Sequence, residues 1–124
     1  MHYKEEHEIE LPCFTQTASL MLNFGGFTFK LPRSGEFTKL TSLKLKGSSI
    51  IDPAELLLMC PSIRVLELKD CWLPDTVKVH SESLQVLCVC TGTDVRCMDI
   101  DTAALQAFDF THSRGHEFTL SFSA

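Results

Sequence analysis

The amino-acid sequence predicts an α/β solenoid of about five stacked coils, with a parallel sheet on the concave face. Three observations support this prediction. A strand-like triplet with apolar residues at its first and third positions recurs along the chain, the interval between triplets is nearly constant, and the triplets fall in a Leu-x-x-Leu-x-Leu pattern. The triplets start at residues 20, 43, 66, 87 and 108, which lie 23, 23, 21 and 21 residues apart. A period of roughly 20–29 residues is typical of leucine-rich repeats.

The repeat is most complete in the middle of the chain and loosest in its first coil. Residues 63–73 match the full template, with Cys71 at the Asn/Cys position, where a small polar group is expected to satisfy backbone groups of the bend. Coil by coil, the residues assigned to the repeat are Leu20, Leu22, Gly25 and Phe27; Leu40, Leu43, Leu45, Ser48 and Ile50; Ile63, Leu66, Leu68, Cys71 and Leu73; Leu84, Leu87 and Val89; and Leu105, Phe108 and Phe110.

The convex side of the stack is predicted to be mostly extended or irregular, with one short helix. Residues 77–84 align with residues 98–105, and each segment opens with an apolar pair at alternate positions, which predicts short extended segments. A helix is predicted over residues 53–59. Asp52 is a favourable N-cap, proline is favoured at the first helical position, and Pro61 ends the helix.

Two parts of the chain are distinguished. Residues 1–10 form an acidic N-terminal segment that is expected to be solvated and partly disordered. Residues 11–124 form one leucine-rich-repeat domain, expected to be uncapped and partial because Phe118–Phe122 opens a further strand without a terminal cap. Uncapped solenoid ends expose apolar edges, so self-association through the ends is expected.

Composition restricts the class of protein. The 124 residues are 44% hydrophobic and 22% charged, as in ordered globular proteins, and the net charge of -5 argues against nucleic-acid binding. No apolar run approaches the ~20 residues of a membrane span, so no membrane partner is expected. The N-terminus lacks the apolar core of a signal peptide, so the expected location is the cytoplasm, the nucleus or both. The six cysteines are then expected to be reduced thiols.

Five motifs are informative in combination: Leu11–Phe14, Leu31–Pro32, Phe37–Leu43, Cys60–Leu68 and Ser81–Leu87. Together they resemble the leucine-rich-repeat region of the plant F-box/LRR family, especially its grass members, many of which carry an FBD-type C-terminal segment. The resemblance implies that the repeats capture a protein substrate for an SCF-type E3 ubiquitin ligase, in which the F-box binds a Skp1-type adaptor. The sequence shows no complete F-box and no FBD-type segment. It therefore resembles the substrate-recognition part alone, and Skp1 binding is not expected.

Two alternative interpretations stay open. One is a truncated, pseudogene-like repeat fragment without independent function. The other is a small thiol or metal-binding protein built on Cys88, Cys90, Cys97, His112 and His116, although this spacing departs from that of known zinc sites. Nucleotide-binding and hydrolase motifs do not occur, so neither enzymatic activity nor a cofactor or metal is expected.

The exposed concave face follows from the alternation of side chains along a strand. Its character changes along the stack, from basic through mixed and apolar to acidic, with Val65, Val86, Cys88 and Cys90 forming a small apolar patch. The sequence therefore predicts a module that binds an unidentified protein. The predicted partner-binding residues are Lys44, Lys46, Val65, Glu67, Lys69, Val86, Cys88, Cys90, Asp109 and Thr111.

Overall fold

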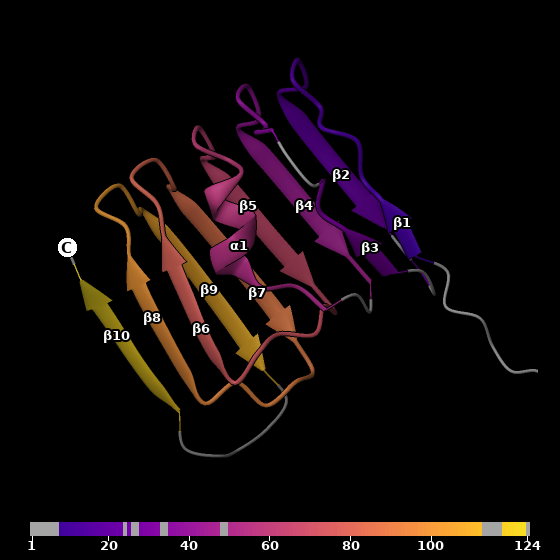
Figure 1. The fold of residues 1–124 in the computed structure, drawn as a ribbon. Helices are drawn as coiled ribbons and strands as arrows, with labels where there is room; N and C mark the ends of the chain where they lie inside the picture. Colours follow the sequence, from indigo (N-terminus) through magenta and orange to yellow (C-terminus); the bar gives the residue numbers. More distant parts are fainter. Residues whose placement is uncertain are drawn as a thin grey trace, which may run out of the picture.

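The computed structural model describes residues 8–23, 25, 28–32, 35–47, 50–112 and 118–123, and it shows a mostly-β solenoid of about four coils (Figure 1). Ten strands and one short helix make up the described part of the chain. In chain order they are β1 (Glu8–Glu10), β2 (Ser19–Asn23), β3 (Thr28–Lys30), β4 (Ser42–Lys46), α1 (Pro53–Leu58), β5 (Val65–Lys69), β6 (Thr76–His80), β7 (Val86–Thr91), β8 (Cys97–Asp101), β9 (Ala107–His112) and β10 (Thr119–Ser123).

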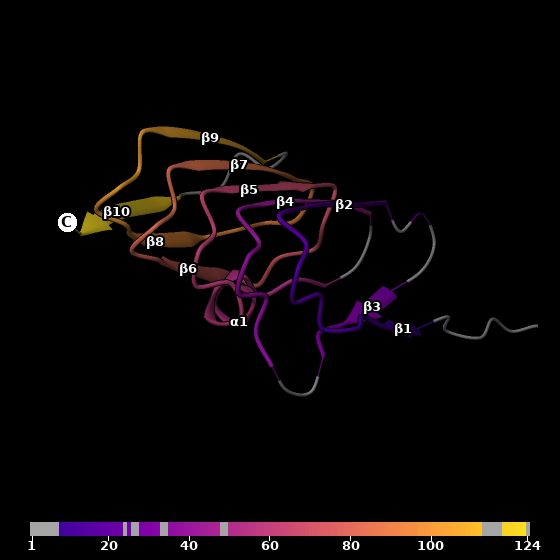
Figure 2. The same cartoon turned by 90° about the horizontal axis from the view of Figure 1, so that it is seen from above.

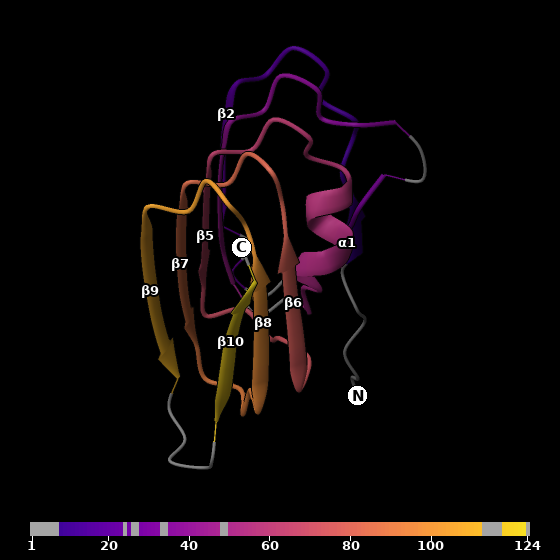
Figure 3. The same cartoon turned by 90° about the vertical axis from the view of Figure 1, so that its left-hand side faces the viewer.

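The strands form two layers, which are seen edge-on in Figures 2 and 3. The front layer is a five-stranded parallel sheet in the order β2-β4-β5-β7-β9, here named the front sheet. The back layer contains the β1–β3 pair, then α1, then a three-stranded parallel sheet in the order β6-β8-β10, here named the back sheet. Each front strand is followed along the chain by one back element, so successive coils stack side by side.

The pairing register of the front sheet reproduces the sequence repeat. Ser19 pairs with Ser42, Ser42 with Val65, Val65 with Val86, and Val86 with Ala107. These pairs lie 23, 23, 21 and 21 residues apart in the sequence. The five strands and the parallel stack predicted from the sequence are therefore confirmed.

A backbone carbonyl just before the front strand holds each coil to the next. The Thr41 carbonyl accepts hydrogen bonds from the N–H groups of Arg64 (2.8 Å) and Val65 (2.9 Å). The carbonyls of Ala18, Arg64 and Gln85 each accept a matching pair of bonds from the coil that follows. The same backbone acceptor therefore recurs from coil to coil along the front sheet, and at Ala18 the Thr41 hydroxyl adds a further hydrogen bond (3.1 Å).

The core lies between the two layers. Leu66 and Leu68 of β5 point inward and are fully buried, while Glu67 between them faces outward and is half-buried. Val77 and Val79 of β6 face them from the back layer, also fully buried. The alternation of side chains across each strand therefore separates the core from the outer faces.

The helix α1 forms where its capping residues predict it. The Asp52 side chain accepts a hydrogen bond from the Ala54 N–H (3.1 Å), Pro53 occupies the first helical turn, and Met59 caps the C-terminus. The helix ends at Leu58, one residue before the predicted end. The extended back segments predicted near residues 77–84 and 98–105 are confirmed as β6 and β8.

The repeat assigns Ile50 to the position equivalent to Leu73, and this assignment is wrong. Ile50 is 77% exposed, and Ile51 is buried instead. Ile50 forms a parallel bridge with Trp72, and the Ile51 N–H donates to the Trp72 carbonyl (2.8 Å). Ile50 and its partner Trp72 are 22 residues apart in the sequence, whereas the paired residues of β4 and β5 are 23 apart. This difference of one residue turns Ile51 toward the core.

Other predictions concern the N-terminal region. Residues 1–7 of the predicted acidic segment lie outside the described residues, while its last three residues form β1, parallel to β3. Phe27 and Ser48 of the predicted repeat also lie outside them. Within the described ranges, the model contains no helix with the length and apolarity needed to cross a lipid bilayer.

Candidate functional site

The outer surface of the front sheet is the main candidate site. In the described part of the chain no other element covers it, since α1 and the back strands all lie on the opposite side (Figures 2 and 3). We name this surface the open face. Its side chains belong to Ser19, Met21, Asn23, Ser42, Lys44, Lys46, Val65, Glu67, Lys69, Val86, Cys88, Cys90, Ala107, Asp109 and Thr111.

The register aligns these side chains in three rows across the strands. The middle row runs from Met21 through Lys44, Glu67 and Cys88 to Asp109. All ten residues predicted to bind a partner lie on this face. The structure therefore brings together residues spread over 68 positions of the sequence, from Lys44 to Thr111.

The basic part of the open face lies on β4 and β5. Lys69 pairs with Glu67 on its own strand, with 3.5 Å between Nζ and Oε2. Lys44 and Lys46 have no carboxylate within ion-pair distance in the described residues, and Lys46 lies opposite Lys69 in the register. Two like charges on neighbouring strands favour an anionic group between them.

The centre of the open face is apolar and carries two thiols. Val65 and Val86 are register partners, and with Cys88 and Cys90 they form a half-buried patch. Burial raises the pKa of the Cys88 thiol, and the nearby carboxylates of Glu67 and Asp109 raise it further. The raised pKa lowers the fraction of Cys88 that is present as the reactive thiolate near neutral pH.

The candidate thiol or metal residues are not brought together. Cys88 and Cys90 face outward from the front sheet, whereas Cys97 lies on β8 in the back sheet. His112 packs at the end of the stack, with its ring centroid 5.0 Å from that of Phe110. His116 lies outside the described residues, among which no cluster of three or more His, Cys, Asp or Glu is arranged to bind a metal ion.

Two buried cysteines have structural positions. The Cys71 thiol lies 3.5 Å from the Lys69 carbonyl and 3.8 Å from the Leu45 carbonyl, so it links two coils at the bend, as its place in the repeat predicts. Burial raises the pKa of Cys71 to about 11 and that of Cys60 to about 12. In the next coil, the Thr91 hydroxyl donates to the Cys71 carbonyl (2.7 Å) and continues the same ladder.

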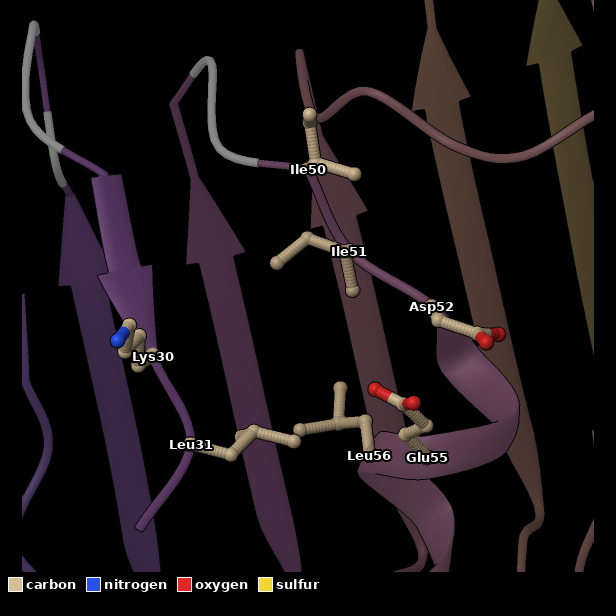
Figure 4. Close-up of a pocket in the computed structure, with 7 residues that line it drawn as sticks. All are labelled: Lys30, Leu31, Ile50, Ile51, Asp52, Glu55 and Leu56. Atoms are coloured by element: carbon tan, nitrogen blue, oxygen red, sulfur yellow. The ribbon is translucent and has the colours of Figure 1, made fainter. Parts of the chain in front are cut away.

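A hollow in the back layer was not predicted from the sequence. A cavity of about 330 Å³ separates β3 from α1, where the helix interrupts strand pairing (Figure 4). Leu31 and Leu56 point toward one another across its floor, and Glu55 stands at the helix side. The signal in the sequence was the helix itself, since a helix within a row of strands cannot continue their hydrogen bonding. The remaining lining residues are Lys30, Ile50, Ile51 and Asp52.

Two further hollows lie at the opposite ends of the coils. One, of about 490 Å³, adjoins the exposed Trp72 ring and includes Asp70 and Thr93. The other, of about 550 Å³, lies between the C-terminal end of α1 and the end of β6, with Leu58 and His80 on its walls. The imidazole of His80 lies 3.9 Å from the Asp99 carboxylate of β8. Neither hollow contains a recognisable catalytic arrangement.

Comparison with known proteins gave no match among family models, curated proteins or solved structures. The chain is a β-solenoid of about four coils with parallel sheets and one short helix.

Proposed function

We propose that the chain is a protein-interaction module that binds a partner protein on its open face. The observation that carries this proposal is a five-stranded surface that no other described element covers, on which charge changes from basic to acidic around an apolar centre. Solenoids commonly use such continuous surfaces for binding, and an apolar patch flanked by charges can supply both affinity and orientation. Catalysis is not part of the proposal.

The chemistry of the open face favours one kind of partner segment. Lys44 and Lys46 are available for carboxylates, while Val65 and Val86 offer contact to an apolar side chain. Asp109, at the other end of the middle row, would repel an acidic residue placed there. A segment that crosses the strands with acidic residues first and an apolar residue second fits this order.

The resemblance to the plant F-box/LRR family extends the proposal to a biological role. In that role the module recognises the substrate of an SCF-type E3 ubiquitin ligase in the cytoplasm or nucleus. The Skp1-type adaptor would contact a separate F-box rather than these coils. This extension rests on the five sequence motifs alone.

A charge-reversal pair tests the binding proposal. Wild-type protein, the open-face variant Lys44→Glu/Lys46→Glu and the control Lys39→Glu/Lys78→Glu are immobilised and exposed to a grass leaf extract, and retained proteins are quantified by mass spectrometry. Lys39 and Lys78 are exposed but lie in a turn and on the back sheet, so the control has the same net charge. We expect a protein that wild type and control retain but the open-face variant retains at least about tenfold less. Equal retention by all three would contradict the proposal.

The ubiquitin-ligase role needs its own experiment. An F-box that binds Skp1 is fused before residue 8, and ubiquitination of the retained protein is assayed with reconstituted ligase components. Modification that disappears with Lys44→Glu/Lys46→Glu is expected. A partner that binds but is never modified would remove the ligase role and leave the binding role intact.

A further inference from the structure

The bend that follows β5 exposes the only tryptophan of the chain beside a hollow. Trp72 is 55% exposed, and the hollow that it lines has a volume of about 490 Å³. The other lining residues are Asp70, Cys71, Gly92, Thr93 and Asp94. Residues 70–72 follow β5 and residues 92–94 follow its neighbour β7, so the hollow lies between two adjacent coils. A large, rigid aromatic ring exposed in a concave surface offers contact area to a ligand at low entropic cost.

The backbone around the hollow is held in place by hydrogen bonds between the coils. The Thr91 hydroxyl donates to the Cys71 carbonyl (2.7 Å), and the Leu73 N–H donates to the Thr93 hydroxyl (3.3 Å). The hydroxyl oxygens of Thr91 and Thr93 lie 2.8 Å apart. Walls that are already ordered lose little conformational freedom when a ligand binds, so the hollow is preorganised.

The lining offers an aromatic ring and negative charge, but few free side-chain donors. The Thr93 hydroxyl is engaged as described above, and the Cys71 thiol lies within hydrogen-bond distance of two backbone carbonyls. Asp70 and Asp94 are acidic, and the Asp70 carboxylate forms no ion pair with the residues that the structure describes. Among those residues no Lys, Arg or His lines the hollow. The hollow therefore favours a cation that brings its own donors over a sugar, whose hydroxyls both donate and accept.

We propose that this hollow binds the guanidinium group of an arginine side chain from a partner protein. A guanidinium stacks on an indole ring and donates to carboxylates, whereas the ammonium of lysine is a compact and more strongly hydrated charge. The net charge of -5 attracts a cationic segment to the protein. The hollow is separate from the open face, so this inference does not depend on the proposed function.

The surroundings of the hollow favour arginine within a peptide over a free small molecule. Ile50 forms a parallel bridge with Trp72 and is 77% exposed, so the apolar contact surface continues beyond the hollow. In the following coil, a Cβ added at Gly92 would meet no heavy atom within 4 Å, which leaves room for a peptide to pass. Free arginine would instead bring its α-carboxylate close to Asp70, and the two negative charges would repel each other.

Nuclear magnetic resonance of the isotope-labelled full chain tests the proposal, because Trp72 gives its only indole N–H signal. The probes are N-acetyl-arginine amide, its lysine and citrulline analogues, free L-arginine and methyl glucoside. We expect N-acetyl-arginine amide to shift the indole signal saturably, with a Kd on the order of 1–10 mM. The lysine analogue and free arginine are expected to bind more weakly, and the two neutral probes to give no saturable shift.

Each probe can contradict the proposal. An indole signal that does not shift with N-acetyl-arginine amide would overturn it, as would an equal response to the citrulline analogue or to methyl glucoside. A lysine analogue that binds as tightly as the arginine compound would overturn the assignment to a guanidinium group. Tighter binding of free arginine would overturn the assignment to a peptide.

A matched pair of variants tests the role of the Asp70 carboxylate. Asparagine tolerates the positive φ of residue 70 (59°) as aspartate does, so Asp70→Asn removes the charge and keeps the bend. The control is Asp101→Asn, because Asp101 is exposed at the end of β8 and does not line this hollow. Asp70→Asn should weaken the binding of N-acetyl-arginine amide roughly tenfold, and Asp101→Asn should change it less than about twofold. The amide spectrum shows whether each variant is folded, and a folded Asp70→Asn protein with wild-type affinity would overturn the proposal.

Discussion

Equivalent positions of the repeat are buried to different extents in interior and in terminal coils. Leu20, Leu66 and Phe108 occupy equivalent places in the front sheet, linked through the strand register. Leu66, in the middle, is fully buried, whereas Leu20 and Phe108, in the outer strands, are only half-buried. Burial in this protein is therefore a property of having neighbours on both sides rather than of the residue itself.

The two ends also differ from each other. The first front strand has behind it the β1–β3 pair and the stacked rings of Phe14 and Phe37. The last coil ends in β10, whose inward Phe122 remains 58% exposed. Inward-facing side chains are therefore less covered in the last described strand than in the middle of the stack.

The comparison of coils predicts a large difference between two identical substitutions. Leu66→Ala is expected to lower the free energy of unfolding by about 3 kcal/mol, because it leaves a cavity in a closed core. Leu20→Ala is expected to lower the free energy of unfolding by only about 1 kcal/mol, because the half-buried Leu20 side chain removes less apolar surface from water. Urea unfolding followed by Trp72 fluorescence measures both, with unchanged m-values as the check on two-state behaviour. Equal losses would show that the terminal coil is packed as tightly as the interior.

Cysteine substitutions sharpen the comparison in the interior. Cys60→Ser is expected to destabilise the protein by about 2 kcal/mol, because the hydroxyl would be buried where the described structure shows no hydrogen bond to the thiol. Cys88→Ser on the open face is expected to change stability by less than about 0.5 kcal/mol. Thermal unfolding of both variants distinguishes the two environments, and a Cys60→Ser protein as stable as wild type would contradict the burial of that thiol.

Alkaline pH should destabilise the folded chain through the same buried thiols. Burial raises the pKa of Cys60 from 9.0 to about 12 and that of Cys71 from 9.0 to about 11. Above about pH 9 the unfolded chain releases these protons while the folded chain retains them, so the free energy of unfolding falls as pH rises toward 11. Well below pH 9 both thiols are protonated in the folded and in the unfolded chain, and they contribute no pH dependence. The slope above pH 9 should be smaller in Cys60→Ala, measured by urea unfolding at a series of pH values.

A smaller effect is expected at two bends between coils. Gly47 and Asp70 occupy equivalent positions, and both have positive φ, 137° and 59°. Asp70→Gly is expected to raise the free energy of unfolding by about 0.5 kcal/mol, since glycine adopts this conformation without strain. Gly47→Ala should lower it by about 1 kcal/mol or more. Calorimetry on the two variants compares them directly, and opposite signs of the change are the diagnostic result.

The smallest effect is expected on the open face. Glu67 and Lys69 form a partly exposed ion pair, with side chains 25% and 51% exposed. Such pairs contribute little, so Lys69→Met should change stability by less than about 0.5 kcal/mol. Unfolding in low and high salt measures this; a larger, salt-sensitive loss would mean that the pair stabilises the coil itself.

The sequence alone determined the repeat and most of what depends on it. Apolar residues at two-residue spacing within the strands, repeated every 21 or 23 positions, require stacked parallel strands because only stacking buries Leu66 and its equivalents. The helix α1 was also predictable, because Asp52 and Pro53 define its start through local backbone chemistry. The open face followed directly from side-chain alternation.

Only the tertiary structure decided the local departures from that repeat and the state of its ends. Ile51 rather than Ile50 enters the core because the bridge to Trp72 shortens the pairing by one residue, and no local pattern encodes that shift. The separation of Cys97 from Cys88, and the exposure of Phe122, depend on which layer and which coil each residue occupies. A periodic sequence specifies which side chains of each coil pack between the layers. How completely each of these side chains is covered depends on the tertiary arrangement of the coils around it.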